Sequence, residues 1–195
     1  MKDFFHRYSY SIVKMFVNQF TISLFGTMLS MATSAIKKPV FSLAVSLFSI
    51  AFYLVLLYTM IWEIGAKDKI SVDVGKKTYR PMTGLYMGLI AAIPNLFFAL
   101  VYSISCPFMG THEWAGVTGL IVRLYTILCE GMYLGTMTTL PLVSEVKLMS
   151  MWWMYYLITV PAIVTAMLAY YIGHKDFRLF AFLFAKKNDA KVKNK

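Results

Sequence analysis

The chain has 195 residues, of which 59% are hydrophobic and only 14% are charged, against roughly 25% charged residues in soluble domains. Its charges are clustered and leave several uncharged runs of about 20 residues, the length that a helix needs to cross a bilayer. These runs leave no room for a separate soluble domain, so we predict one all-α, polytopic membrane domain over residues 1–195. The net charge of +10 then indicates basic loops that contact anionic lipid headgroups, and no nucleic-acid partner.

The sequence has no pattern typical of an enzyme or a metalloprotein. Its three histidines are scattered near the ends of apolar runs, and its two cysteines have neither ligand nor redox spacing: His6, His112 and His174; Cys106 and Cys129. We therefore expect no catalytic residue, no metal and no cofactor, and cysteines that pack in apolar segments.

The uncharged runs predict four full transmembrane helices and one broken segment. The spans are predicted at about 16–36, 40–62, 82–108 and 151–173, the broken segment at about 114–145, a basic cytoplasmic loop at 63–81, an amphipathic interfacial entry at 1–14 and a basic amphipathic tail at 174–195. The first run is longer than the core of a signal peptide, so we expect it to remain as a membrane helix. Aromatic belts are predicted at the two ends of the last span: Trp152, Trp153, Tyr155 and Tyr156, then Tyr170 and Tyr171.

The first two spans each carry a row of hydroxyl residues on one helical face, spaced three or four apart. The rows are Ser23, Thr27, Ser30 and Ser34 in the first span, and Ser42, Ser46, Ser49 and Tyr53 in the second. Only Lys37, Lys38 and Pro39 separate the spans, which makes them antiparallel neighbours. We expect the two hydroxyl faces to pack together; a polar face that lines a solute path is the functional alternative.

Prolines interrupt two of the spans. Pro94 lies near the middle of the third span and is followed by Asn95, and Pro161 is central in the last span. A proline inside a helix frees a backbone carbonyl and kinks the helix. Asn95 is therefore predicted as a polar side chain beside a break at membrane depth, where it either binds a ligand or bonds a neighbouring helix. In the loop before this span, the alternation of Ile70, Val72 and Val74 suggests a short hairpin.

The broken segment carries a polar stripe. On a helix from Trp114 the stripe contains Gly116, Gly119, Arg123, Thr126, Glu130 and Tyr133. Charged side chains at membrane depth are costly, so they face protein or water and are paired. Arg123 and Glu130 are two turns apart, about 10 Å along the axis, which favours a bridging group over a direct pair. The candidate ligand-binding residues are Arg123, Glu130, Tyr133 and Asn95; a structural ion pair, or a helix lying flat at the interface, is the alternative.

The distribution of basic residues predicts how the broken segment sits. If it does not cross the membrane, fifteen basic residues lie inside, three lie outside and Arg123 lies in the segment; if it crosses once, nine lie on each side. The positive-inside rule therefore predicts a re-entrant segment or two short helices, with both termini cytoplasmic.

A faint internal repeat supports this topology. Gly84-Leu-Tyr-Met-Gly88, with Pro94 six residues on, matches Gly131-Met-Tyr-Leu-Gly135, with Pro141 six residues on. If the copies are equivalent, Gly131 begins an outward-going helix as Gly84 does. Interrupted segments at corresponding positions indicate the binding site of a transporter.

These patterns favour a small integral protein of the cell membrane that binds or helps to move a solute, as a homo-oligomer or with a partner membrane subunit. In this interpretation Arg123 contacts an anionic group, and Glu130 balances it or carries a proton. A membrane scaffold or assembly subunit is the alternative, and no enzymatic activity is expected.

The size, basic character and possible six-segment layout resemble the substrate-binding subunits of energy-coupling-factor vitamin transporters. Those subunits have an Ala-x-x-x-Ala pattern in the first helix, which docks their transport partner. Here Ala32 and Ala35 are three residues apart instead of four. The resemblance implies a vitamin-binding subunit as a further reading of the chain.

Overall fold

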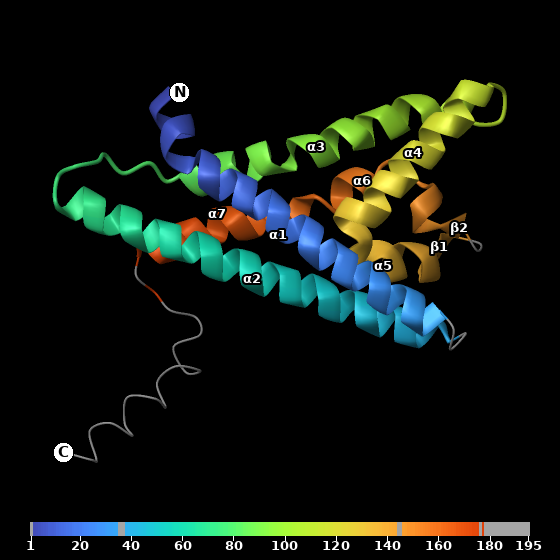
Figure 1. The fold of residues 1–195 in the computed structure, drawn as a ribbon, viewed down its shortest axis with the longest axis horizontal. Coiled ribbons are helices and arrows are strands. Elements are labelled where there is room, and N and C mark those ends of the chain that lie inside the picture. Colours follow the sequence, from blue (N-terminus) through green and yellow to red (C-terminus); the bar gives the residue numbers. More distant parts are fainter. Residues whose placement is uncertain (1, 35–37, 144–145, 176, 178–195) are drawn as a thin grey trace, which may run out of the picture.

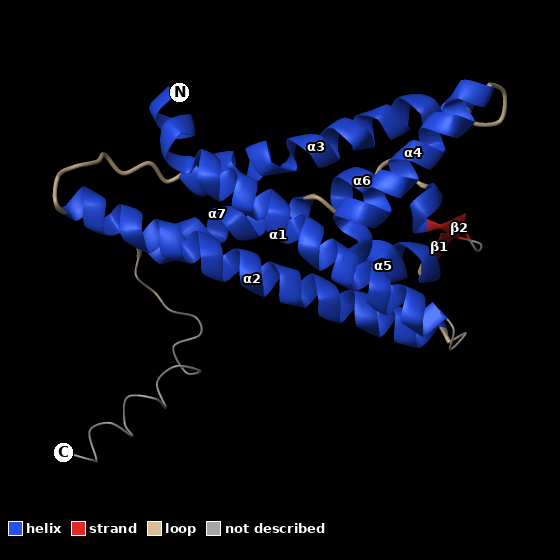
Figure 2. Ribbon diagram, viewed as in Figure 1, coloured by secondary structure: helices blue, strands red, loops and turns tan. Residues whose placement is uncertain are grey.

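The computed structural model describes every residue except 1, 35–37, 144–145, 176 and 178–195. Ala35 and most of the predicted basic tail therefore lie outside the described residues. In chain order the elements are α1 (Lys2–Ser34), α2 (Pro39–Asp73), α3 (Thr83–Ser105), the 3-10 turn η1 (Cys106–Phe108), α4 (Glu113–Glu130), the 3-10 turn η2 (Gly131–Tyr133), α5 (Leu134–Thr139), β1 (Pro141–Val143), β2 (Val146–Lys147), the 3-10 turn η3 (Leu148–Ser150), α6 (Met154–Leu157) and α7 (Val160–His174). Figure 2 shows the helical character of the chain, with β1 and β2 as one short antiparallel pair.

Within the described residues, five helical segments are long and apolar enough to cross a membrane. They are Phe4–Thr33, Pro39–Asp73, Thr83–Phe108, Glu113–Thr139 and Met154–His174. This confirms the prediction of an all-α chain with helices of transmembrane length.

The burial pattern has the polarity of a protein surrounded by lipid. On α3 the exposed side chains form an apolar stripe: Tyr86, Leu89, Ile93, Phe97, Leu100 and Ile104. On α2 the buried stripe is mostly small and polar: Ser42, Ser46, Ser49, Tyr53, Leu57, Ile61, Gly65 and Asp68. Small residues allow close approach of helix backbones when the surrounding solvent is itself apolar.

Two helices are longer than the sequence predicted. α1 begins at Lys2 and includes the predicted interfacial entry, and α2 continues to Asp73 through the first part of the predicted loop. The predicted hairpin is wrong, because Gly75 ends a helix instead of turning a strand. Gly75 has φ +74° and its N–H donates to the Val72 carbonyl at 2.9 Å, while the Lys76 N–H donates to the Ser71 carbonyl at 3.0 Å. These two bonds are a Schellman helix ending.

The bundle has two ends, which we name after a lysine at each. At the Lys77 end lie the start of α1, the α2–α3 connection and the end of α7; at the Lys147 end lie the start of α2, the α3–α4 connection and the β1–β2 pair (Figure 1). α4 begins at the Lys147 end and reaches the middle of the molecule, where η2 joins it to α5, and α5 leads back toward the Lys147 end (Figure 1). Lys38, Thr139 and Lys147 accordingly line one surface cavity.

The last span is also broken. α6 ends at Leu157 and α7 begins at Val160, so Pro161 lies in the first turn of α7 instead of in a helix centre. A proline is well placed there, because the first N–H groups of a helix have no intrahelical acceptor. The aromatic belt is only partly as predicted, since Tyr155 and Tyr170 are buried.

The hydroxyl rows of α1 and α2 bond to the broken segment. Thr27 Oγ1 donates to the Ile127 carbonyl at 2.8 Å, Ser46 Oγ donates to the Met132 carbonyl at 2.6 Å, and the Gly131 N–H donates to Ser23 Oγ. We expected the two rows to pack on each other. These hydroxyls bond instead to the backbone of residues 127, 131 and 132. Irregular backbone at membrane depth is tolerated only where its polar groups are satisfied inside the protein, and these hydroxyls satisfy it.

Both glycine pairs of the internal repeat are close-packing points. A Cβ at Gly84 would lie 2.6 Å from the Ala166 carbonyl oxygen of α7, and one at Gly135 would lie 2.2 Å from the Ser42 carbonyl oxygen of α2. The first pair therefore allows α3 to pack closely on α7, and the second allows η2 and α5 to pack closely on α1 and α2.

Candidate functional site

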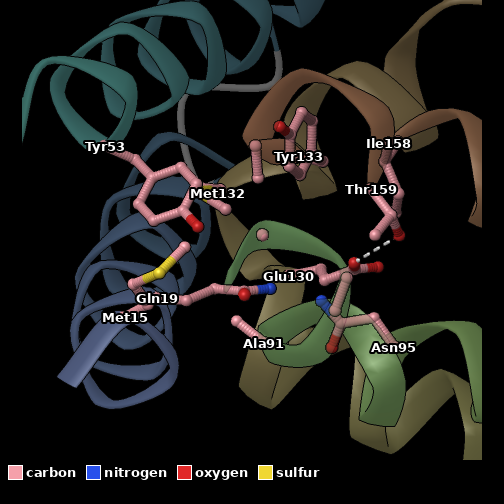
Figure 3. A pocket seen from close by; sticks show the side chains of 13 residues that line it. Met15, Gln19, Tyr53, Ala91, Asn95, Glu130, Met132, Tyr133, Ile158 and Thr159 are labelled. Carbon is pink, nitrogen blue, oxygen red and sulfur yellow. Dashed lines mark hydrogen bonds between the residues drawn. The ribbon is translucent and has the colours of Figure 1, made fainter. Parts of the chain in front are cut away.

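The breaks in two segments meet at the carboxyl group of Glu130. Glu130 is the last residue of α4, and its backbone has φ −133° and ψ 20°, which interrupts the helix. Its side chain is only 3% exposed. Thr159, between α6 and α7, lies with its Oγ1 3.2 Å from Oε1 of Glu130 (Figure 3). The site therefore joins two helix interruptions that are far apart in the sequence.

The Thr159 hydroxyl has two acceptors within reach. It lies 3.2 Å from Glu130 Oε1 and 3.1 Å from the Tyr155 carbonyl oxygen. A hydroxyl has one hydrogen to donate and lone pairs to accept. It therefore donates to a Glu130 carboxylate, whereas beside a protonated Glu130 it donates to Tyr155 and accepts from the acid. Thr159 can therefore hydrogen-bond to Glu130 whether the carboxyl is ionised or protonated.

Asn95 lies beside Glu130, as Figure 3 shows. It follows Pro94 inside α3, is buried, and accepts a hydrogen bond from the Tyr125 hydroxyl at 2.7 Å. The Tyr125 ring also stacks on Phe98 at a centroid distance of 3.8 Å. Asn95 thus bonds a neighbouring helix, one of the two roles that its position predicted, and it faces the cavity as well.

Glu130 lines a small cavity together with other polar side chains. Its volume is about 10 Å³, and it is lined by Asn95, Glu130, Tyr133, Tyr53, Gln19 and Thr159 among others. This is about the space that one water molecule needs. Tyr133, which also lines the cavity, has a buried hydroxyl that finds no hydrogen-bond partner among the described residues.

Arg123 lies apart from this cavity. Its Nε is buried and has no hydrogen-bond partner among the described residues. No ion pair joins Arg123 to Glu130 in the described part of the chain, where the ion pairs are Glu63–Lys67 and Asp68–Lys77. The structure therefore brings together Glu130, Tyr133 and Asn95 and separates Arg123 from them.

Three residues of the site did not stand out in the sequence as site residues. Thr159 and Gln19 have no charge and no motif, and Tyr53 was noted only as a member of a hydroxyl row. Gln19 Nε2 donates to the Cys129 carbonyl at 3.1 Å, which fixes the last turn of α4. The sequence did contain one indication of Thr159. It lies two residues before Pro161, and a proline there indicates a helix interruption.

No cluster of three or more metal-ligating side chains exists among the described residues. No known protein family, curated protein or solved structure matches the chain.

Proposed function

We propose that the protein is a small multi-pass component of a membrane transport process in which Glu130 takes up and releases a proton. The observation that carries the proposal is the placement of one buried carboxyl, without a cationic partner among the described residues, at the meeting point of two interrupted membrane segments. Interrupted helices are where transporters bind substrates and coupling ions, and intramembrane carboxyls are typical of proton relays.

The size of the cavity supports a proton over an organic solute. A cavity of about 10 Å³ holds a water molecule, whereas pockets for organic ligands measure about 300–1,000 Å³. The dual hydrogen bonding of Thr159 supports the same choice, because both states of Glu130 keep a partner. A vitamin-binding role has no comparable support at this site.

The proposal includes a topology in which residues 113–139 enter the membrane and return, with four full crossings and both termini in the cytoplasm. It is supported by the location of Lys38 and Lys147 around one cavity, since a single crossing would separate them. It also leaves most basic residues on one side, as cytoplasmic loops of a cell-membrane protein do.

The test is infrared difference spectroscopy of the purified protein in lipid nanodiscs, recorded across a pH titration. Wild type is expected to show the C=O stretching band of a protonated carboxyl at the frequency typical of an apolar environment. This band should disappear as the pH rises and the carboxyl ionises. Glu130→Gln should lack this band, and Glu63→Gln should retain it, because the side chain of Glu63 is 61% exposed and pairs with Lys67 on the surface.

Each result bears on the proposal. Loss of the band in Glu130→Gln alone, with an unchanged unfolding temperature, supports a proton site. A band that persists in Glu130→Gln, or a wild type without any titrating band, overturns it and leaves Glu130 a structural group of an assembly or scaffold subunit.

A further inference from the structure

A second polar site lies at the Lys77 end of the bundle, remote from Glu130. It is a cavity of about 300 Å³ formed by the start of α1, the end of α2, the α2–α3 connection and the end of α7. Four basic residues line it, Arg7, Lys76, Lys77 and Arg80, against one acidic residue, Asp68. The cavity is thus large enough for a ligand and carries an excess of positive charge.

The carboxylate of Asp68 is already bonded to side chains of the protein. It is buried, it pairs with Lys77, and it accepts hydrogen bonds from the hydroxyls of Tyr8 and Tyr170, the latter at 2.9 Å. These bonds join α1, α2 and α7 at one point. Because Lys77 neutralises the carboxylate, Asp68 does not cancel the charge of the other three basic residues.

Arg7, Lys76 and Arg80 remain for a ligand. All three are exposed at the cavity, and none has an ion pair with a described acidic side chain. Guanidinium and ammonium groups that converge on one space recognise phosphate, Arg through paired N–H donors and Lys as a compact charge. Thr78 adds a hydroxyl to the lining.

We propose that this cavity binds a phosphate monoester or diester group through Lys76 and Arg80, with Arg7 as the third contact. Two sources carry that group: the headgroup of an anionic phospholipid in the adjoining leaflet, or a soluble phosphate compound. Basic pockets between membrane helices are known sites for anionic headgroups. The site is independent of the proton site, because none of its lining residues contributes to the cavity at Glu130.

The experiment compares two variants that each remove two positive charges. Lys76→Gln/Arg80→Gln removes two charges from the α2–α3 connection at the cavity, and Lys67→Gln/Lys69→Gln removes two charges from the last turns of α2, outside the cavity. One arm counts the phosphatidylglycerol molecules that the full-length protein retains from mixed phosphatidylcholine nanodiscs, by native mass spectrometry. The other arm titrates inorganic phosphate against thermal unfolding in an uncharged detergent.

Binding in either arm should weaken about tenfold or more in the cavity variant, since each basic residue near a membrane surface contributes about one kcal/mol. It should change little in the matched control. The responding arm identifies the source of the phosphate. Equal losses in both variants would show general surface attraction, and no binding in either arm would show no site; both results overturn the proposal. Glu130→Gln should bind as wild type does, so failure of the proton site leaves this test intact.

Discussion

Replacing Gly135 by alanine tests whether the broken segment packs on α2 as described. An added Cβ would lie 2.2 Å from the Ser42 carbonyl oxygen and 2.8 Å from Ser46 Cβ. The nearest atom belongs to the backbone, so no side-chain rotation relieves the overlap, and α5 must move away by roughly 1 Å to restore ordinary contact.

The magnitude follows from two contributions. Overpacking of this kind costs about 1–3 kcal/mol. A shift of α5 also weakens the bonds that Ser46 makes to the Met132 carbonyl and the Thr136 N–H, at 2.6 and 3.2 Å, at about 1 kcal/mol each. We expect a loss of about 2–5 kcal/mol in the free energy of unfolding, equivalent to about 5–15 °C for a chain of this length.

The assay is thermal unfolding in mild detergent, followed by the fraction of monodisperse protein on size-exclusion chromatography. The matched control is Gly116→Ala on α4, where an added Cβ meets no atom within 4 Å; it should leave stability unchanged or raise it by up to about 1 kcal/mol, because alanine favours helix. The packing described here is refuted if the two variants unfold at the same temperature.

Two further pairs of variants test single contacts by the same assay. Ser46→Ala should lower the free energy of unfolding by about 1–3 kcal/mol, because it removes the partner of two backbone groups. Ser49 is equally buried but bonds only within its own helix, so Ser49→Ala should lower it clearly less. Similar losses in the two variants would argue against the bridging role of Ser46. Asp68→Asn should cost about 2–4 kcal/mol because it breaks a buried ion pair, and Glu63→Gln should cost no more than about 1 kcal/mol; a reversed order would contradict the role of Asp68 in joining three helices.

The spacing of residues predicted which faces are buried but not what covers them. The hydroxyl rows of α1 and α2 follow helical spacing, and Ser23, Thr27 and Ser46 do face the interior. Spacing alone could not tell that their partner is the backbone of residues 127–136, because that partner exists only where the chain departs from helical geometry.

The candidate site was predicted in part for a similar reason. Glu130, Tyr133 and Asn95 share a cavity, as polar groups at membrane depth tend to do. Arg123 shares the α4 stripe with Glu130 and Tyr133 on an ideal helix, yet it lies two turns before Glu130, about 10 Å along the helix axis. The break at Glu130 then redirects the following residues. Thr159 belongs to a second helix interruption, between α6 and α7, and only the tertiary structure brings that interruption beside the one at Glu130.

The side of the membrane on which Lys147 lies decides whether residues 113–139 return to the side from which they enter. Lys38→Cys, Lys147→Cys and Lys76→Cys, each in a background with Cys106→Ser and Cys129→Ser, are labelled in intact cells with a membrane-impermeant maleimide. If residues 113–139 enter the membrane and return, positions 38 and 147 are labelled from outside and position 76 is labelled only after the membrane is opened. Labelling of position 147 together with position 76 would show that the segment crosses once, and would contradict the re-entrant topology.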